Sequence, residues 1–139
     1  MTETETPPLY VAEIPLRWSD MDSLGHVNNA VYFTYCETAR LGLLHHLGLG
    51  DYQGEVGPVV ATASCTFKEQ LTFPATLAVE VRCTKVGRTS FTLGYTLKRK
   101  TTEGLDPTLV CTGESVLVWV DLVRGGSVPL PDDLRQALG

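Results

Sequence analysis

The sequence lacks a long apolar run: none of its 139 residues lie in a stretch near the roughly 18 apolar residues that a membrane-spanning helix needs. Its first residues, MTETETPPLY, are acidic and polar, whereas signal and transit peptides begin with positive charge. A basic surplus is missing too, because the net charge is −5. Nucleic-acid binding normally needs a basic face. We therefore expect a cytoplasmic protein that binds neither membranes nor nucleic acids.

Patterns typical of metal sites are also missing. The chain has four cysteines, Cys36, Cys65, Cys83 and Cys111. They are far apart, form no CxxC pair and lie in apolar segments, where we expect each to be a small buried hydrophobe. The adjacent His45 and His46 would point about 100° apart on a helix, so they cannot easily share one ion. The sequence predicts no metal ion and no bound cofactor.

The chain shows no internal repeat, linker or low-complexity segment. Its length suits one domain, since about 150 residues per domain is typical. The 43% hydrophobic content is that of an ordinary globular protein and gives no sign of disorder. We expect a flexible tail over residues 1–9 and a single domain over residues 10–139.

One long helix is predicted after residue 28. Apolar side chains recur there at three- and four-residue spacing: Tyr32, Tyr35, Cys36, Ala39, Leu43 and Leu47. Asn28 or Asn29 can cap its start, and Gly48 or Gly50 can end it. His45 and His46 would lie in the last turn, where partial positive charge suits the helix dipole.

Strands are predicted on both sides of this helix. Residues 10–19 form a first candidate, which Pro15 makes an edge strand or a bulge. Four later segments are rich in Val, Thr, Phe and Leu: 56–71, 76–86, 89–100 and 108–123. Turns are expected at residues 87–88 and 103–104. A short closing helix is expected to begin with Pro131 at its first position.

This order predicts an α+β fold: a curved antiparallel sheet wrapped around one long helix, followed by a short C-terminal helix. A sheet of this size leaves its edges open, and pairing of two copies through one edge would remove it. We therefore expect at least a homodimer.

The segment SDMDSLGHVNNAVYF, residues 19–33, concentrates polar side chains where the helix begins. A helix N-terminus offers free N–H groups and roughly half a positive charge, which suit an oxyanion that develops during a reaction. A nearby carboxylate can attack a carbonyl or activate water. Asp20 and Asp22 are both candidates for that carboxylate.

The motif DSLGHVNNAVYFTYCETAR, together with FKEQLTFP, VGRTSFTLGYTL and SVLVWVD…VPLP, gives the chain a family resemblance. In their order over residues 10–138 these stretches resemble the hotdog-fold acyl-CoA thioesterases of the 4-hydroxybenzoyl-CoA thioesterase-like family. The resemblance implies a hotdog fold, a homodimer or homotetramer, and hydrolysis of an acyl-CoA to the free acid and CoA.

The resemblance also assigns residues of the site. It implies that Asp22 acts as nucleophile or general base and that the backbone N–H of Asn29 polarises the thioester carbonyl. His26 could order Asp22, contact the substrate or only brace the loop, and Asn28 is expected to cap the helix or brace the loop. Asp20 remains the alternative carboxylate.

Other predicted contacts concern the coenzyme. Arg88, Thr89 and Ser90 are candidates for binding the CoA phosphates or pantetheine arm, although Arg88 taken alone is better explained as the tip of a solvated hairpin. The basic run at residues 97–100 admits the same two interpretations. Glu37 could be catalytic, as in some relatives of the wider superfamily, or it could pair with Arg40 or Arg17.

Two other functions fit the same fold. One is an acyl-CoA-binding module without catalysis, and the other is an enoyl-CoA hydratase or dehydratase. Tyr32, Tyr35 and Phe67 could shape an acyl pocket or simply belong to the core. The length and aromaticity of the acyl group, and whether its carrier is CoA or an acyl carrier protein, stay open at this point.

Overall fold

The computed structural model describes residues 6–49 and 54–139. Its elements follow the order β1 (Tyr10–Pro15), η2 (Trp18–Asp20, one 3₁₀ turn), α1 (Asn29–His46), β2 (Val56–Phe67), β3 (Thr76–Val86), β4 (Ser90–Thr101), β5 (Gly104–Asp121) and α2 (Asp132–Leu138). Of the predicted tail, residues 1–5 lie outside the described part. Within it, the Leu9 N–H donates to the Val81 carbonyl at 2.8 Å.

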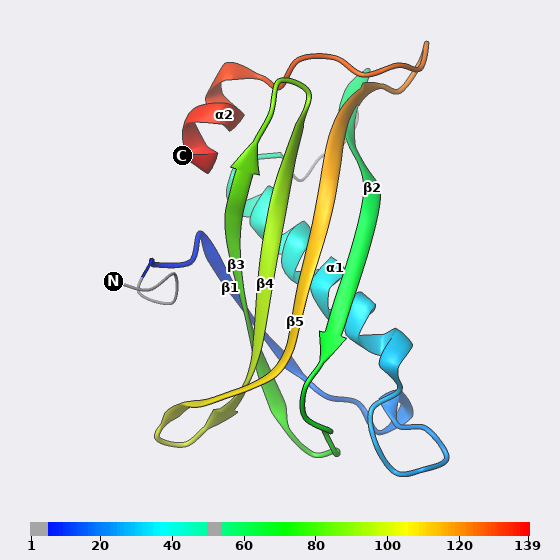
Figure 1. The fold of residues 1–139 in the computed structure, drawn as a ribbon, viewed down its shortest axis with the longest axis vertical. Coiled ribbons are helices and arrows are strands. Elements are labelled where there is room, and N and C mark those ends of the chain that lie inside the picture. Colours follow the sequence, from blue (N-terminus) through cyan, green and yellow to red (C-terminus); the bar gives the residue numbers. More distant parts are fainter. Residues whose placement is uncertain (1–5, 50–53) are drawn as a thin grey trace.

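The five strands form one antiparallel sheet in the order β1-β3-β4-β5-β2. β3, β4 and β5 follow one another through short turns, as predicted, whereas β2 joins the far side of β5 (Figure 1). β1 is one edge, so the prediction that Pro15 belongs to an edge strand is confirmed. The strand ends at Pro15 rather than at residue 19, because the chain then turns into η2.

α1 crosses one face of the sheet along 18 residues (Figure 1). Of the two predicted caps, Asn28 is the one used, because its side chain accepts the Ala30 N–H. Gly48 follows the helix with a φ of 83°, a left-handed conformation that glycine adopts without strain. Gly50 lies outside the described residues. The α+β architecture with one long helix against an antiparallel sheet is confirmed.

The core lies between α1 and the sheet. On β4, buried side chains alternate with half-buried ones, as expected for a sheet with one covered face. Gly113 on β5 lets the helix come close, since a Cβ there would stand 3.2 Å from the Cys36 Sγ. α2 closes one end with Leu134 and Leu138. Pro131 is the N-cap of this helix and not its first residue as predicted, because the helix begins one residue later, at Asp132.

The four cysteines are free thiols, but they are not equally buried. Cys36 and Cys111 belong to the core, as predicted. Cys65 and Cys83 are only half-buried, so the prediction of four buried cysteines is wrong for these two. Both lie at positions where the sheet is incompletely covered by α1: Cys65 is on the edge strand β2, and Cys83 lies near the end of β3.

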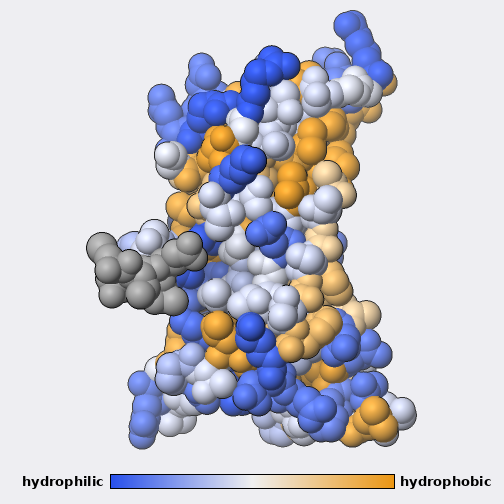
Figure 2. Space-filling view, in the orientation of Figure 1, coloured by the Kyte–Doolittle hydropathy of each residue, from blue (hydrophilic) through white to orange (hydrophobic). Residues whose placement is uncertain are grey.

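The outer face of the sheet is more polar than the face under α1. Figure 2 shows its middle in white and blue, with hydrophobic residues above and below it. Glu80 is held there by Lys98 at 3.0 Å and by the Thr96 hydroxyl at 2.9 Å. Along residues 6–49 and 54–139, no helix has the length and apolar character that crossing a membrane would require.

Candidate functional site

The polar segment before α1 folds into a closed loop. The Asn28 N–H donates to the Asp20 carbonyl at 3.0 Å, and the Asp22 N–H donates to the His26 carbonyl at 2.8 Å. Gly25 sits in the turn with a φ of 81°, which a larger side chain would find strained. These bonds draw Asp22 and His26 together and return the chain to the start of the helix.

The carboxylate of Asp22 is oriented by the backbone of its own loop. Its Oδ1 accepts the Leu24 N–H at 2.9 Å and the His26 N–H at 3.4 Å. Within residues 6–49 and 54–139 these bonds use only Oδ1, and they leave Oδ2 without a protein donor. Asp22 is therefore held by one oxygen while the other can meet a ligand.

The first turn of α1 presents backbone N–H groups beside this carboxylate. Asn28 accepts two of them: its side chain takes the Ala30 N–H at 2.9 Å, and its carbonyl takes the Val31 N–H at 2.9 Å. The Asn29 N–H is the first amide of the helix, and neither bond occupies it. Together with the helix dipole, it gives this end a partial positive charge.

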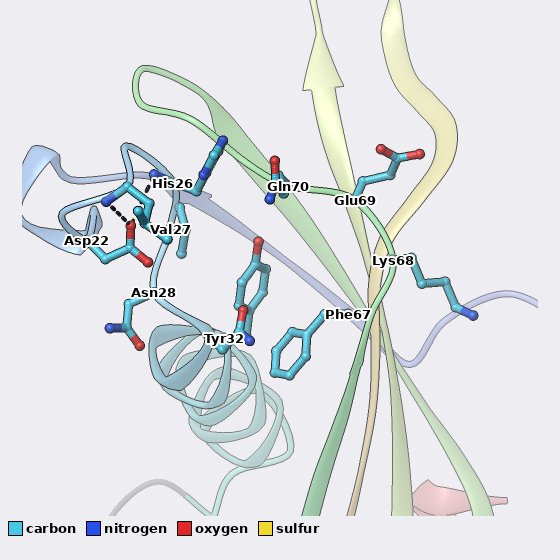
Figure 3. Close-up of a pocket in the computed structure, with 11 residues that line it drawn as sticks. Asp22, His26, Val27, Asn28, Tyr32, Phe67, Lys68, Glu69 and Gln70 are labelled. Atoms are coloured by element: carbon cyan, nitrogen blue, oxygen red, sulfur yellow. Dashed lines mark hydrogen bonds between the residues drawn. The ribbon is translucent and has the colours of Figure 1, made fainter.

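Asp22, His26, Asn28 and Asn29 line the same cavity, whose volume is about 540 Å³. One wall is the loop before α1, and the other is the segment 67–70, which begins with the last residue of β2 (Figure 3). The structure thus brings together all four residues predicted to act at or beside the helix start.

Aromatic rings close the base of the cavity between its two walls (Figure 3). Tyr32 is 2% exposed and meets Phe67 edge to face, with ring centroids 5.3 Å apart. Burial raises the pKa of Tyr32 to about 12, so its phenol stays protonated at neutral pH and cannot serve as a base. Tyr32 belongs both to the core and to the cavity.

Three polar residues of the cavity have no role in the sequence-based prediction. Lys68, Glu69 and Gln70 line the wall opposite Asp22. They belong to the FKEQL stretch, which contributes to the family resemblance, and three polar residues directly after a strand were the available signal. Nothing in the sequence placed this stretch opposite the start of α1.

Asp20 lies away from the cavity. It is 2% exposed, and its carboxylate accepts bonds from the Arg17 backbone and guanidinium and from the Tyr35 hydroxyl. Burial alone would raise the pKa of Asp20, but the donors of Arg17 and Tyr35 hold it below its ordinary value. Its lone pairs are engaged inside the protein, so of the two aspartates Asp22 is the one that faces the cavity.

Glu37 is also absent from this cavity. It lies on the exposed side of α1 beside a second hollow of about 240 Å³ between α1 and β2. Its carboxylate is 3.9 Å from the Arg40 guanidinium. Of the two predicted partners of Glu37, the structure therefore pairs it with Arg40 and not with Arg17. Arg17 instead pairs with Asp20.

The predicted coenzyme contacts lie elsewhere. Arg88 and Thr89 form the β3–β4 turn and Ser90 begins β4, at the opposite end of the sheet from the loop before α1 (Figure 1). The Thr89 carbonyl accepts the Trp119 N–H at 2.8 Å, so this turn is tied to β5. A single chain does not bring these residues to the cavity, and their contact with a coenzyme stays a prediction.

The sequence model of the thioesterase-like superfamily matches residues 16–138, which include the whole cavity. The chain belongs to the thioesterase-like superfamily. This confirms the resemblance, and with it the hotdog fold and the class of thioester hydrolases. In the described part of this thioesterase-like protein, no three His, Cys, Asp or Glu side chains form a group able to hold a metal ion.

Solved structures agree with this family. The PA2801 protein of Pseudomonas aeruginosa is 37% identical, with a TM-score of 0.87 over 95% of this chain and 99% of that one. The PA5185 protein of the same organism is 30% identical, with a TM-score of 0.81 over 94% and 90% of the two chains. In a comparison of sequences, the YsmA protein of Bacillus subtilis is 28% identical over 98% of this chain and 89% of its own.

Proposed function

We propose that this protein hydrolyses the thioester bond of an acyl-CoA, with Asp22 as nucleophile or general base and the Asn29 N–H polarising the carbonyl. The observation that carries the proposal is that a carboxylate with one free oxygen and the first amide of α1 line the same cavity. Membership of the thioesterase-like superfamily supports hydrolysis of a thioester in general.

The geometry suggests how the chemistry proceeds. Asp22 either attacks the thioester carbon or takes a proton from a water that attacks it, and the carbonyl oxygen gains negative charge in both cases. The Asn29 N–H and the helix dipole stabilise that charge, and one such donor is worth on the order of 10²–10³ in rate. The C–S bond then breaks, and CoA leaves as a thiolate that takes up a proton. If Asp22 was the nucleophile, the acyl group stays on it as an anhydride, which water then hydrolyses to the free acid and the carboxylate. If water was the nucleophile, the free acid forms directly as the C–S bond breaks.

The other loop residues support Asp22. The His26 backbone both donates to Asp22 and accepts from it, which fixes the carboxylate, while its ring lines the cavity. Asn28 holds the first turn of α1 by accepting two of its N–H groups, and this turn begins with Asn29, which lines the cavity.

CoA is the carrier of the substrate in a protein of the same fold. The structural relatives include the BH1999 gentisyl-coenzyme A thioesterase, which is 20% identical, with a TM-score of 0.81 over 93% of this chain and 99% of that one. At that identity the likeness shows the fold alone. The acyl group of this protein is therefore left to experiment, and so is an acyl carrier protein as the alternative carrier.

We also propose that the protein works as a homodimer formed through β2, or as a homotetramer of such pairs. β2 is an edge strand of 12 residues with exposed Val56, Val59 and Val60. Antiparallel pairing of β2 with a second β2 would extend the sheet and bring opposite ends of two chains to the same side. A coenzyme arm could then run from the cavity of one chain toward the 88–90 turn of the other.

The first test is thiol release from short, medium, long and aromatic acyl-CoAs by the wild type and by Asp22→Asn. Loss of the carboxylate should lower kcat by on the order of 10²–10⁴, the usual contribution of a general base. Asp121→Asn is the matched control, because Asp121 also accepts two backbone N–H groups in a turn, but far from the cavity. It should leave kcat unchanged.

Other outcomes lead elsewhere. Full activity of Asp22→Asn would move the catalytic role to Glu69, the other carboxylate that lines the cavity in the described part of the chain. A wild type that releases no thiol from any substrate would refute the hydrolase, and tight acyl-CoA binding would then favour the non-catalytic alternative. Conversion of an enoyl-CoA to its 3-hydroxy product would instead identify a hydratase.

A further inference from the structure

Asp20 is a buried charge that the proposed reaction does not use. Among residues 6–49 and 54–139 it is the only charged residue in the buried class, with 2% exposed. Such a group is costly to bury unless donors satisfy it. Here its Oδ1 accepts the Arg17 guanidinium at 2.8 Å, and its Oδ2 accepts the Arg17 N–H at 3.0 Å.

One further donor links Asp20 to the long helix. The Tyr35 hydroxyl donates to Asp20 Oδ2 at 2.8 Å in a bond that is itself buried. Tyr35 is 3% exposed and packs edge to face against Tyr32, with ring centroids 5.9 Å apart. The core therefore holds the Tyr35 ring in place, and through its hydroxyl the ring fixes the position of the Asp20 carboxylate relative to α1.

The backbone of Asp20 is bonded to the start of α1. Its carbonyl accepts the N–H of Asn28, the residue that caps α1. Between these two residues the chain runs out to Asp22 and back, with Met21 paired to Val27 as a single antiparallel bridge. Asp20 thus stands at the base of the loop, and Asp22 lies only two residues beyond it.

From these contacts we infer that the buried Asp20–Tyr35 pair positions the loop, so that the Asp22 carboxylate and the Asn29 N–H keep the separation that thioester attack requires. Neither residue touches the cavity, so both are positioning residues and not catalytic ones. This inference rests on the proposed function. A misplacement of about 1 Å can cost on the order of 10² in rate, so one lost hydrogen bond at the base of the loop is enough to matter.

The alternative is that the pair only adds stability, and a matched control separates the two. Tyr35→Phe removes only the hydroxyl that bonds Asp20. Tyr95→Phe removes another buried tyrosine hydroxyl, which bonds Ser115 between β4 and β5, accepts the Arg40 guanidinium at 3.5 Å and makes no contact with the loop. Both variants should lower Tm, since each loses the hydrogen bonding of one buried tyrosine hydroxyl.

The experiment compares kcat, KM and Tm of the wild type, Tyr35→Phe, Tyr95→Phe, Asp20→Asn and the double variant of Asp20 and Tyr35. We expect Tyr35→Phe to lower kcat about tenfold or more with KM within about twofold, because a misplaced carboxylate slows the reaction more than it weakens binding. Tyr95→Phe should keep kcat. The double variant should be no slower than Asp20→Asn, because the two residues act through one bond.

The outcomes distinguish this inference from the proposed function. An active wild type whose kcat is unchanged in Tyr35→Phe would overturn the inference alone. A wild type that hydrolyses no thioester would overturn the proposed function. In that case amide hydrogen exchange decides the positioning: faster exchange over residues 20–28 in Tyr35→Phe but not in Tyr95→Phe supports it, and equal exchange in the two variants refutes it.

Discussion

Asp20 and Asp22 have the same side chain and differ in what the folded chain places around them. The carboxylate of Asp20 is bonded to the Arg17 guanidinium and the Tyr35 hydroxyl, and these bonds hold the base of the loop. Asp22 accepts two backbone N–H groups through one oxygen and keeps the other toward the cavity. The difference arises because the chain turns between them, which places one side chain under α1 and the other in front of it.

Asp20 should make stability depend on pH at the acid end. Arg17 and Tyr35 hold the folded pKa of Asp20 below its ordinary value of 3.8, so its contribution is complete at pH values well above 3.8. It is lost as the pH falls from there through the lower folded pKa. Asp20→Asn should cost about 1–3 kcal/mol at pH 7.

Urea unfolding of the wild type and Asp20→Asn between about pH 6 and pH 3 checks this prediction, since the linkage acts only where the aspartate titrates. The difference in unfolding free energy between the two proteins should shrink as the pH falls. A difference that stays constant over this range would show that the charge of Asp20 does not contribute.

The long helix shows how an element is fixed by contacts that its own sequence does not reveal. The Asn28 cap before its start and Gly48 after its end are signals that the local sequence carries. Its seat on β1 is not local, because Gly42 faces the ring of Tyr10, and a Cβ at position 42 would stand 2.6 Å from Tyr10 Cε2. The glycine is unfavourable for a helix but allows the ring to pack against it.

Gly42→Ala should therefore have different effects in two backgrounds. In the wild type the added methyl group should displace the Tyr10 ring, and overpacking of this kind typically costs about 1–3 kcal/mol. That cost offsets the gain of about 1 kcal/mol in helix propensity, so the substitution should not stabilise the wild type. In Tyr10→Ala the ring is gone, and Gly42→Ala should then be stabilising.

A double-mutant cycle by urea denaturation measures both effects. Destabilisation of the same size in the two backgrounds would mean that Tyr10 does not set the requirement for glycine at position 42.

The two edges of the sheet differ in a way that bears on assembly. β1 is short and ends in proline, which limits further pairing. β2 is long, and its valines are exposed beside the hollow under α1. An edge of this kind favours pairing with another strand, and a second copy of the chain is the proposed partner.

Val59→Lys should weaken that assembly, because a charged side chain on an edge strand opposes pairing. Val11→Lys on β1 is the matched control, since Val11 and Val59 have similar exposed fractions of 43% and 46%. Sedimentation equilibrium should show more monomer for Val59→Lys than for Val11→Lys. Equal association of both variants would place the interface elsewhere than at β2.

The sequence alone was enough for the order of the elements and for the family. Apolar spacing of 3.6 residues marks α1, alternation marks the later strands, and Pro15 marks an edge, because each of these signals lies within a few neighbouring residues. The motif before α1 pointed to Asp22, His26, Asn28 and Asn29, and these four residues share a cavity.

Only the tertiary structure placed the 67–70 segment opposite Asp22, joined Asp20 to Tyr35, and left 88–90 at the far end of the sheet. Half-burial of Cys65 and Cys83 was also decided there, since their local sequence is as apolar as that of Cys36. Each of these features depends on contact between segments far apart in the chain. The local pattern of residues determines whether a segment favours helix or strand and which of its side chains face the core. Which distant segments then touch each other depends on how the helix and the sheet pack.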